Sequence, residues 1–350
     1  MMMDRRDFLK LGAAASVGTL VSSAPAPGAE PTASAEAARP GQQPMIWGNL
    51  LHLSVNMWCD WDAPELKGDD SNYRPELRFD RSLWNDLLQR MQQAGMNLVV
   101  IDLGDGVQYA SHPEIAVKGA WSTAELRSEL KRMRSLGLEP IPKLNFSTTH
   151  DAWLGKYARC VSTDTYYAVC RDLIAEVIGL FDRPRFLHLG MDEEDYGNQK
   201  YYEHVCIRQY DLWWRDFLFL VQQVEKAGAR AWIWSDYVWH HPELFYRKMP
   251  KSVVQSNWYY DAKFDPQNAR AKAFRELQEH GYDQIPTGSN YYNSTNFGAL
   301  VGECQRSLSP AHLLGFLQTP WKATQEKHRQ RHLEAIEQVG QAMQSGRSGR

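Results

Sequence analysis

The sequence predicts an α/β protein built as a single (β/α)8 TIM barrel. From residue 45 onward, strand-like and helix-like segments alternate, and eight such pairs can be counted over about 300 residues. Eight parallel strands with helical crossovers close into a barrel. The alternative is an open doubly wound sheet, but no glycine-rich dinucleotide-binding loop follows an early strand. Since no repeat or linker interrupts the pattern, one domain is expected.

The first units carry clear end signals. A strand at 46–58 leads into a long polar loop, and the helix at 81–94 stops at Gly95. The strand at 97–103 is followed by a helix to residue 136 that begins with the capping box Ser122 to Glu125. Further strands are expected at 139–146, from 186 to the acids near 192, and at 229–236, 252–260, 284–292 and 313–321. Further helices are expected at 163–181, 202–228, 242–248, 266–280, 295–308 and 324–343.

The N-terminus predicts an export signal. Arg5 and Arg6 precede a mildly apolar run at 11–21, and small residues follow at 24–26, which is the order of a twin-arginine signal peptide. The run is too short for a stable membrane span. We therefore expect a signal peptide at 1–26, a disordered lead-in at 27–43 and the barrel at 44–345. The twin-arginine export machinery would be a partner, and the location periplasmic or extracellular.

The composition is that of a soluble globular protein that binds no nucleic acid. The 350 residues are 43% hydrophobic and 23% charged, with a net charge of −3 and no block of basic residues. Thirteen Trp and sixteen Tyr exceed what packing requires, and aromatic faces suit sugar rings, although any single Trp can equally be core. The five Cys show no metal-ligand spacing; Cys160 and Cys170 could pair, which the sequence does not decide.

One stretch, Phe186 to Asp195, is the candidate active site. An apolar run ends there in four consecutive carboxylates, which repel one another and therefore indicate a polar site at the end of a buried strand. Side chains alternate along a strand, so His188, Gly190 and Asp192 share one face, and Gly190 leaves room beside the acids. Glu193 can turn toward the same ligand where the strand ends.

The pattern His188-x-Gly190-x-Asp192-Glu193 resembles the signature of the family 20 glycoside hydrolases, the β-N-acetylhexosaminidases. The resemblance implies retaining, substrate-assisted hydrolysis of an N-acetylhexosaminide, without cofactor or metal. It makes Glu193 the general acid and base, and Asp192 the acceptor of the acetamido N–H. His188 would orient the acids, and the substrate would be a carbohydrate.

Residues at the other predicted strand ends extend the resemblance. Indole rings wall the terminal sugar in that family, and a strand-seven tyrosine contacts the acetamido group. The segment 142–150 is a loose copy of the family's strand-three motif. The substrate-binding candidates are therefore His188, Asn145, His150, Trp234, Asp236, Trp258, Tyr291 and Trp321; Trp58 and Tyr259 also end predicted strands.

The sequence also departs from the family pattern. No Arg occurs in 49–58, where the family holds sugar hydroxyls with one. The family's Tyr-x-Asp reads Tyr291-Tyr292-Asn293 here, and its Trp-x-Glu reads Trp321-Lys322-Ala323. These changes leave the identity of the sugar open.

Three other readings remain. Lys143, on an inward strand face, could form a Schiff base in a lyase, or it could hold Asp192 or Asp102 ionised in an ion pair. The barrel could bind glycans without turnover. A metal site of His188, Asp192 and His240 or His241 lacks compact ligand spacing.

Overall fold

The computed structural model describes residues 44–348, with side chains to residue 345. The expected signal peptide at 1–26 and lead-in at 27–43 lie outside the described residues. The elements below all belong to the second of the chain's two units, Met45–Arg350.

Eight parallel strands form one sheet in the order β6-β5-β4-β3-β2-β1-β8-β7. Between its two ends, β6 and β7, parallel bridges pair Gln255 with Gln284 and Trp258 with Thr287. The sheet therefore closes into a barrel, as predicted, and the open doubly wound alternative is excluded. The strands are β1 Ile46–His52, β2 Leu98–Asp102, β3 Glu139–Lys143, β4 Phe186–His188, β5 Arg230–Trp234, β6 Val254–Ser256, β7 Thr287–Gly288 and β8 Gly315–Gln318.

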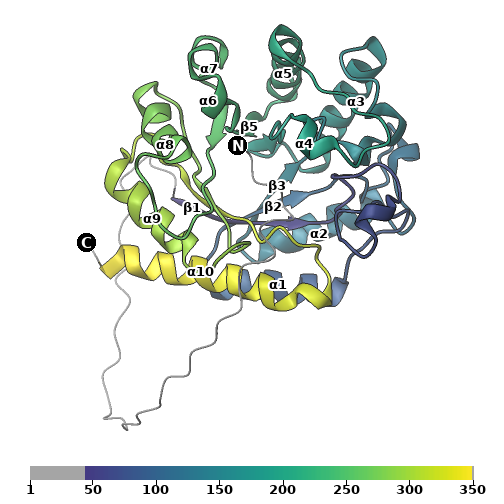
Figure 1. Cartoon of the computed structure of the whole chain (residues 1–350). Coiled ribbons are helices and arrows are strands. Elements are labelled where there is room, and N and C mark those ends of the chain that lie inside the picture. Colours follow the sequence, from purple (N-terminus) through teal and green to yellow (C-terminus); the bar gives the residue numbers. More distant parts are fainter. Residues whose placement is uncertain (1–43, 349–350) are drawn as a thin grey trace. The chain divides into compact units, whose positions relative to one another are not determined.

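Helices follow the strands and surround the barrel (Figure 1). They are α1 Arg81–Gln93, α2 Thr123–Ser135, α3 Asp164–Leu180, α4 Tyr196–Gln199, α5 Tyr210–Lys226, α6 Tyr237–His240, α7 Pro242–Lys248, α8 Ala269–Glu279, α9 Asn296–Ser307 and α10 Arg329–Ser348. The capping box at Ser122 forms with both of its hydrogen bonds. At the end of the chain, α10 packs against α9 and α1, so the last helix helps to close the helical ring.

Several predicted elements are longer than the observed ones. The strand expected at 46–58 ends at His52, the strand expected at 284–292 is reduced to Thr287–Gly288, and the helix expected at 202–228 begins only at Tyr210. Residues 202–209 instead bond to loops of the barrel: the Tyr202 hydroxyl donates to the Thr149 carbonyl at 2.8 Å, and Arg208 donates to the Phe146 carbonyl at 2.7 Å. These tertiary bonds replace the first turns of the predicted helix.

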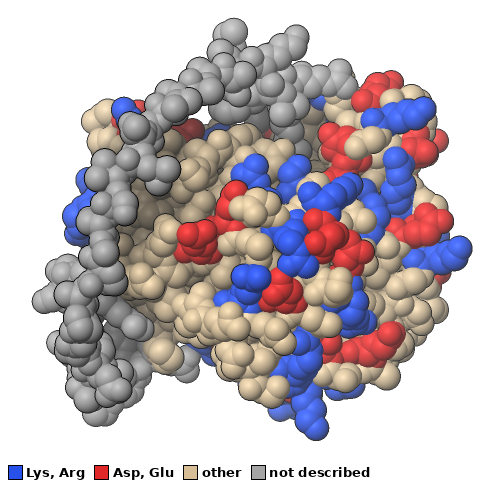
Figure 2. Space-filling model, turned by 90° about the horizontal axis from the view of Figure 1, so that it is seen from below, with Lys and Arg blue, Asp and Glu red and all other residues tan. Residues whose placement is uncertain are grey.

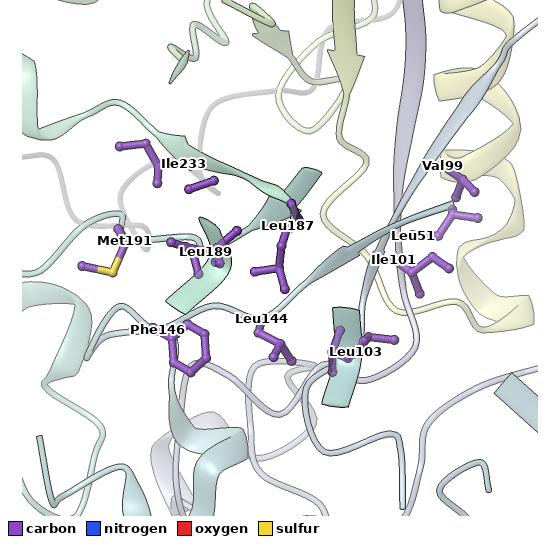
Figure 3. Close-up of a cluster of buried hydrophobic side chains, with 14 of the residues drawn as sticks. Leu51, Val99, Ile101, Leu103, Leu144, Phe146, Leu187, Leu189, Met191 and Ile233 are labelled. Carbon is purple, nitrogen blue, oxygen red and sulfur yellow. The ribbon is translucent and has the colours of Figure 1, made fainter. Parts of the chain in front are cut away.

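Side chains alternate along each strand and therefore form two hydrophobic cores, one between the strands and the helices and one inside the barrel. Outward-facing residues such as Leu51, Val99 and Leu187 pack toward the helices (Figure 3). The second cluster takes inward positions of β1–β6 and β8, together with Ile285 just before β7. Its members in the lower barrel are Ile46, Leu50, Leu98, Val100, Ile141, Phe186, Trp232, Val254, Ile285 and Leu317. Above this apolar plug, toward the carboxyl ends of the strands, the inward residues become polar or aromatic. The barrel thereby positions a site at its C-terminal face.

The surface and cysteines add little to function. On the face seen in Figure 2, basic and acidic side chains are intermixed. Among the described residues, no helix has the length and apolarity needed to cross a membrane. All five cysteines lie in the described range and are free, so Cys160 and Cys170 do not form a disulfide.

Candidate active site

Asp192 and Glu193 sit on a tight loop just beyond β4. The ladder continues past the strand through a hydrogen bond from the Trp234 N–H to the Gly190 carbonyl at 3.0 Å. The backbone then takes positive φ at Gly190 (72°), Met191 (73°) and Glu193 (54°). Because the chain leaves the extended conformation, consecutive side chains no longer alternate, and both acids can face one site.

The four consecutive carboxylates have four different environments. Asp192 and Glu193 form the site, whereas Glu194 accepts hydrogen bonds from the Thr148 N–H at 2.9 Å and from Arg208, with which it forms a buried ion pair. Asp195 caps α4 by accepting from the Asn198 N–H at 3.1 Å. Two of the four acids are thus structural. Sequence analysis did not identify Arg208, which lies fourteen residues from its partner.

Asn145 ties the end of β3 to the acidic loop. Its amide nitrogen donates to Asp192 Oδ1 at 2.9 Å, and its oxygen accepts from the backbone N–H groups of Ser147 at 3.0 Å and Met191 at 3.2 Å. A Cβ at Gly190 would lie 1.8 Å from that oxygen. The room that Gly190 leaves is therefore filled by the Asn145 amide, which fixes the orientation of Asp192.

His150 lies between the two acids. Its Nδ1 is 3.7 Å from Asp192 Oδ1, and its Nε2 is 3.7 Å from Glu193 Oε2. The imidazole edge also faces the Trp58 ring, with 6.2 Å between centroids. One ligand atom from each of His150, Asp192 and Glu193 lies within 4.8 Å of the others, a set that a divalent cation could also ligate.

Asp236, at the end of β5, brings a third carboxylate to the site. Its Oδ2 accepts from the Glu193 N–H at 2.8 Å, while its buried Oδ1 has no hydrogen-bond partner among the described residues. Burial raises the pKa of Asp236 well above its ordinary value, and the charge of Asp192 adds to the rise. Burial also raises the pKa of Asp192, but the Lys143 charge and the Asn145 hydrogen bond oppose it. Of Asp192 and Asp236, Asp236 is therefore the one that favours the protonated form, and Asp192 is the one that favours the ionised form.

A charged layer lies beneath the acids. Lys143 is fully buried and forms an ion pair with Asp102, as one of the sequence interpretations predicted. Burial alone would raise the pKa of Asp102, but Lys143 and His52 outweigh it and lower that pKa to about 2. His188 accepts at Nδ1 from the Gly190 N–H at 3.0 Å, and burial together with the Lys143 charge lowers its pKa well below the usual range. A neutral His188 thus supports the acidic loop from below.

Aromatic rings from the later strands face this charged layer. Trp234 lies 4.3 Å from the His188 ring and 5.8 Å from the Trp321 ring, measured between centroids. Trp258 stacks on Tyr260, with centroids 5.0 Å apart and planes 27° from parallel. These indoles are the ones that the sequence suggested as pocket walls. Trp234 and Trp258 are almost fully buried, and Trp321 is partly exposed.

Tyr260 belongs to this aromatic wall, and sequence analysis missed it. The predicted strand end named Tyr259, whose hydroxyl instead donates to the Lys263 carbonyl at 2.9 Å. Tyr260 lies two residues after Trp258 and therefore shares its inward face, a period-two signal that could have found it. The Trp321 indole N–H donates to its hydroxyl at 3.1 Å.

Tyr291, the tyrosine that the resemblance selected, lies at the end of β7. Its ring packs edge-on against Tyr292, with centroids 4.8 Å apart, and the Lys322 ammonium is 5.4 Å from its centroid. Asn293, two residues further on, accepts at Oδ1 from the Thr295 and Asn296 N–H groups at 3.1 and 2.8 Å, just before and at the start of α9. Lys322 therefore lies beside Tyr291, and Asn293 holds the start of α9.

Comparison with known proteins gives likeness of fold. No family model matches the chain, and no curated protein matches its sequence. Similar solved structures include a β-N-acetylhexosaminidase from Bacteroides fragilis (15% identity, TM-score 0.57, covering 84% of this chain and 65% of that one). A second is a family 20 β-N-acetylhexosaminidase from Streptomyces coelicolor, with 13% identity and a TM-score of 0.58 over 85% of this chain and 64% of that one. A third is a family 20 exo-β-N-acetylglucosaminidase from Vibrio harveyi, with 13% identity and a TM-score of 0.58 over 84% of this chain and 54% of that one.

These likenesses show that the barrel has the same architecture as those enzymes. The chain spans less than two thirds of the length of each of the three. At 13–15% identity the comparison extends to the fold alone, and the chemistry has to be argued from the site itself.

Proposed function

We propose that this protein is a glycoside hydrolase that cleaves N-acetylhexosaminides by substrate-assisted, retaining hydrolysis. The observation that carries the proposal is the grouping of Asp192, Glu193 and His150, whose ligand atoms lie within 4.8 Å of one another, with the Trp58 ring 6.2 Å from the His150 ring. Carboxylates beside aromatic faces suit a sugar ring, because its hydroxyls and its apolar C–H face need both surfaces. The signature around Asp192 and the similarity in fold to β-N-acetylhexosaminidases favour the same reaction.

The two acids have distinct roles in the proposed reaction. Asp192, fixed by Asn145, accepts the N–H of the substrate's acetamido group, whose carbonyl oxygen then bonds to the anomeric carbon. The bond to the leaving oxygen breaks as Glu193 gives that oxygen its proton. Water then attacks the anomeric carbon and gives a proton to Glu193, while the bond from that carbon to the acetamido oxygen breaks and the acetamido group is restored. The enzyme is regenerated, and two displacements retain the configuration.

The placement of the acids favours this route over a protein nucleophile. Ordinary retaining enzymes place one carboxylate on each side of the scissile bond. Asp192 and Glu193 lie on one loop, and both border His150, so they approach a ligand from the same side. An intramolecular nucleophile supplied by the substrate removes the need for a carboxylate on the opposite face.

The test is turnover of an aryl N-acetylglucosaminide by Glu193→Gln. Loss of the proton donor should lower kcat by about 10³-fold, within the usual range for general acid–base groups. A panel of chromogenic glycosides with and without the 2-acetamido group should show turnover only with it. Undiminished activity of Glu193→Gln, or equal turnover of both classes, would refute the proposal.

The alternatives predict different results. A metal-dependent reaction would stop on chelation with EDTA, whereas the proposed reaction continues unchanged. A lyase would be labelled at Lys143 by borohydride and a keto substrate, but that amine is buried against Asp102. A barrel that only binds glycans would bind N-acetylglucosamine and hydrolyse no glycoside in the panel.

Residues 1–26 are proposed to direct export by the twin-arginine pathway. The support is the order of Arg5, Arg6 and the short apolar run that follows. Replacing both arginines by lysine should retain the full-length precursor in the cytoplasm, which cell fractionation would show. Unchanged periplasmic or extracellular accumulation would contradict this route.

A further inference from the structure

The histidine and the two acids of the candidate site have the composition of a metal-binding site. Among the residues that the structure describes, His150, Asp192 and Glu193 are the one group of three such side chains whose ligand atoms all lie within 4.8 Å of one another. Two ligands of a tetrahedral zinc ion lie roughly 3.3 Å apart, so each pair has to close by at most about 1.5 Å. The Glu193 side chain is 24% exposed and can make that movement.

Neighbouring groups already orient two of these ligands, as they usually do in metal sites. The Thr149 hydroxyl donates to the Asp192 carbonyl at 3.1 Å and lies 2.8 Å from His150 Nδ1. This pattern assigns the ring hydrogen to Nδ1 and the lone pair to Nε2, the nitrogen 3.7 Å from Glu193 Oε2. The Asn145 amide holds Asp192 Oδ1 at 2.9 Å. The imidazole therefore presents a lone pair on the side of the acids.

Asp236 gives a second, independent indication that a cation binds here. Its side chain is buried, with 8% of the residue exposed, and its Oδ2 accepts from the Glu193 N–H at 2.8 Å. Its Oδ1 is also buried and has no hydrogen-bond partner among the described residues. A buried carboxylate oxygen without a partner is unfavourable, and a cation could satisfy it in place of a proton.

The site also gathers negative charge. The charges of Asp192 and Glu193 both act on Asp236, so the three carboxylates lie within electrostatic reach of one another. Lys143 lies beneath them, but it forms an ion pair with Asp102 and therefore balances at most part of that charge. A divalent cation would gain attraction from all three acids at once.

We propose that His150, Asp192 and Glu193 bind a divalent transition-metal ion of the Zn²⁺ type, and that the bound ion inhibits the enzyme. A nitrogen together with carboxylate oxygens suits Zn²⁺ better than Mg²⁺, which prefers oxygen ligands alone. The ion would occupy the Glu193 oxygen that has to carry the proton for the leaving group, and it would keep the acetamido N–H away from Asp192. The inhibition rests on the proposed hydrolase function, whereas the binding site does not.

Isothermal titration calorimetry of the whole protein with Zn²⁺, after removal of metals by EDTA and dialysis, tests the site directly. We expect one Zn²⁺ per chain and no comparable binding of Mg²⁺. His150→Gln and Glu193→Gln should each weaken Zn²⁺ binding by more than about 10-fold, because even the hydrogen-bond partners of metal ligands typically contribute 10- to 100-fold to affinity. Asp236→Asn should weaken it about 10-fold on the same basis.

His112 provides a matched control. Its Nδ1 lies 3.4 Å from a Glu114 oxygen and its Nε2 lies 3.6 Å from an Asp172 oxygen, so it also has two carboxylates nearby. The ligand atoms of these three side chains do not come together as those of the candidate site do. His112→Gln should therefore leave both Zn²⁺ affinity and turnover unchanged.

The effect on catalysis is measured with 4-nitrophenyl N-acetylglucosaminide. Turnover should fall as Zn²⁺ is added, recover when EDTA is added and show no response to Mg²⁺. In the calorimeter, N-acetylglucosamine should compete with the ion, since both need Asp192 and Glu193.

The outcomes keep the two proposals apart. An absence of Zn²⁺ binding, or binding that survives both His150→Gln and Glu193→Gln, would overturn the metal site and leave the hydrolase function standing. Bound Zn²⁺ that leaves turnover unchanged or raises it would overturn the inhibition. If no glycoside were hydrolysed but the variants still lost Zn²⁺, the hydrolase function would fail and the metal site would remain.

Discussion

The two halves of the barrel mouth are built on different principles. At the ends of β1–β4, the inward residues are mostly charged or strongly polar, and each is held by a specific partner, as in the pairs Lys143–Asp102 and Asn145–Asp192. At the ends of β5, β6 and β8, the inward residues are mostly aromatic and touch through their rings, as Trp258 and Tyr260 do. We call these the charged half and the aromatic half.

The difference follows from what burial does to each kind of group. A buried charge without a partner is strongly unfavourable, so every ionised group of the charged half needs a bond that fixes its position. Buried rings gain free energy from contact area with little directional demand. The charged half can therefore place reacting groups accurately, while the aromatic half shapes the space for the ligand. Substitutions should accordingly affect stability in the first half and ligand affinity in the second.

The largest effect is expected for Lys143→Met in the charged half. This change leaves Asp102 buried without its cationic partner, which typically lowers the free energy of unfolding by about 3–5 kcal/mol. Urea denaturation would measure the loss. The double variant Lys143→Met/Asp102→Leu replaces the pair by apolar groups and should recover most of the stability. A single variant as stable as wild type would break the distinction between the halves.

The same pair gives the charged half a pH dependence. The pKa of Asp102 is lowered from its ordinary 3.8 to about 2, so the folded state favours the carboxylate. A group with a depressed folded pKa contributes stability above its unfolded pKa and loses it as the pH falls through the folded one. Wild type should therefore lose about 2 kcal/mol from this group between about pH 4 and pH 2, a loss that the double variant should not show.

The sequence predicts the fold well because the barrel repeats one simple unit. Alternating segments, the capping box at Ser122 and the helix-ending Gly95 are local signals, and the structure confirms the barrel that they imply. Strand lengths are poorly predicted, since β7 needs only Thr287 and Gly288 to complete the barrel. The late start of α5 also escapes prediction, because Tyr202 and Arg208 bond to distant loops rather than to their own helix.

The sequence likewise predicts some features of the candidate site and misses others. The sequence names Asp192, Glu193 and His150 as site residues because they follow consecutive strands, whose ends converge at one face of a barrel, and the structure groups them. The sequence does not reveal that the Asn145 amide fills the space at Gly190, since that depends on a side chain from the neighbouring strand. It also does not separate Tyr259 from Tyr260, because only the register of β6 decides which one faces inward.

Gly190→Ala tests how tightly the charged half is fixed. A Cβ there would lie 1.8 Å from Asn145 Oδ1, on a backbone with φ of 72°. The left-handed conformation costs alanine about 1 kcal/mol, and displacing Asn145 breaks its buried hydrogen bonds for about 2 kcal/mol more. We expect a total near 3 kcal/mol by thermal denaturation, with a loss of turnover.

The matched control for that change is Gly137→Ala. Gly137 follows α2 with φ of 75°, but a Cβ there would meet nothing within 4 Å. It should therefore lose about 1 kcal/mol, from the backbone conformation alone, and keep full activity. Similar losses in the two variants would mean that Asn145 can move away, and the charged half would then be less rigid than its contacts indicate.

The smallest effect is expected for Trp321→Phe in the aromatic half. The change keeps an aromatic ring near Trp234 and removes the indole N–H that donates to the Tyr260 hydroxyl. Losing one neutral hydrogen bond of about 1 kcal/mol should raise KM about fivefold, with kcat nearly unchanged and little change in melting temperature. Trp214→Phe, in the buried face of α5, is the control and should lower the melting temperature without changing KM. If Trp321→Phe instead lowered stability and left KM unchanged, the aromatic half would be core rather than ligand surface.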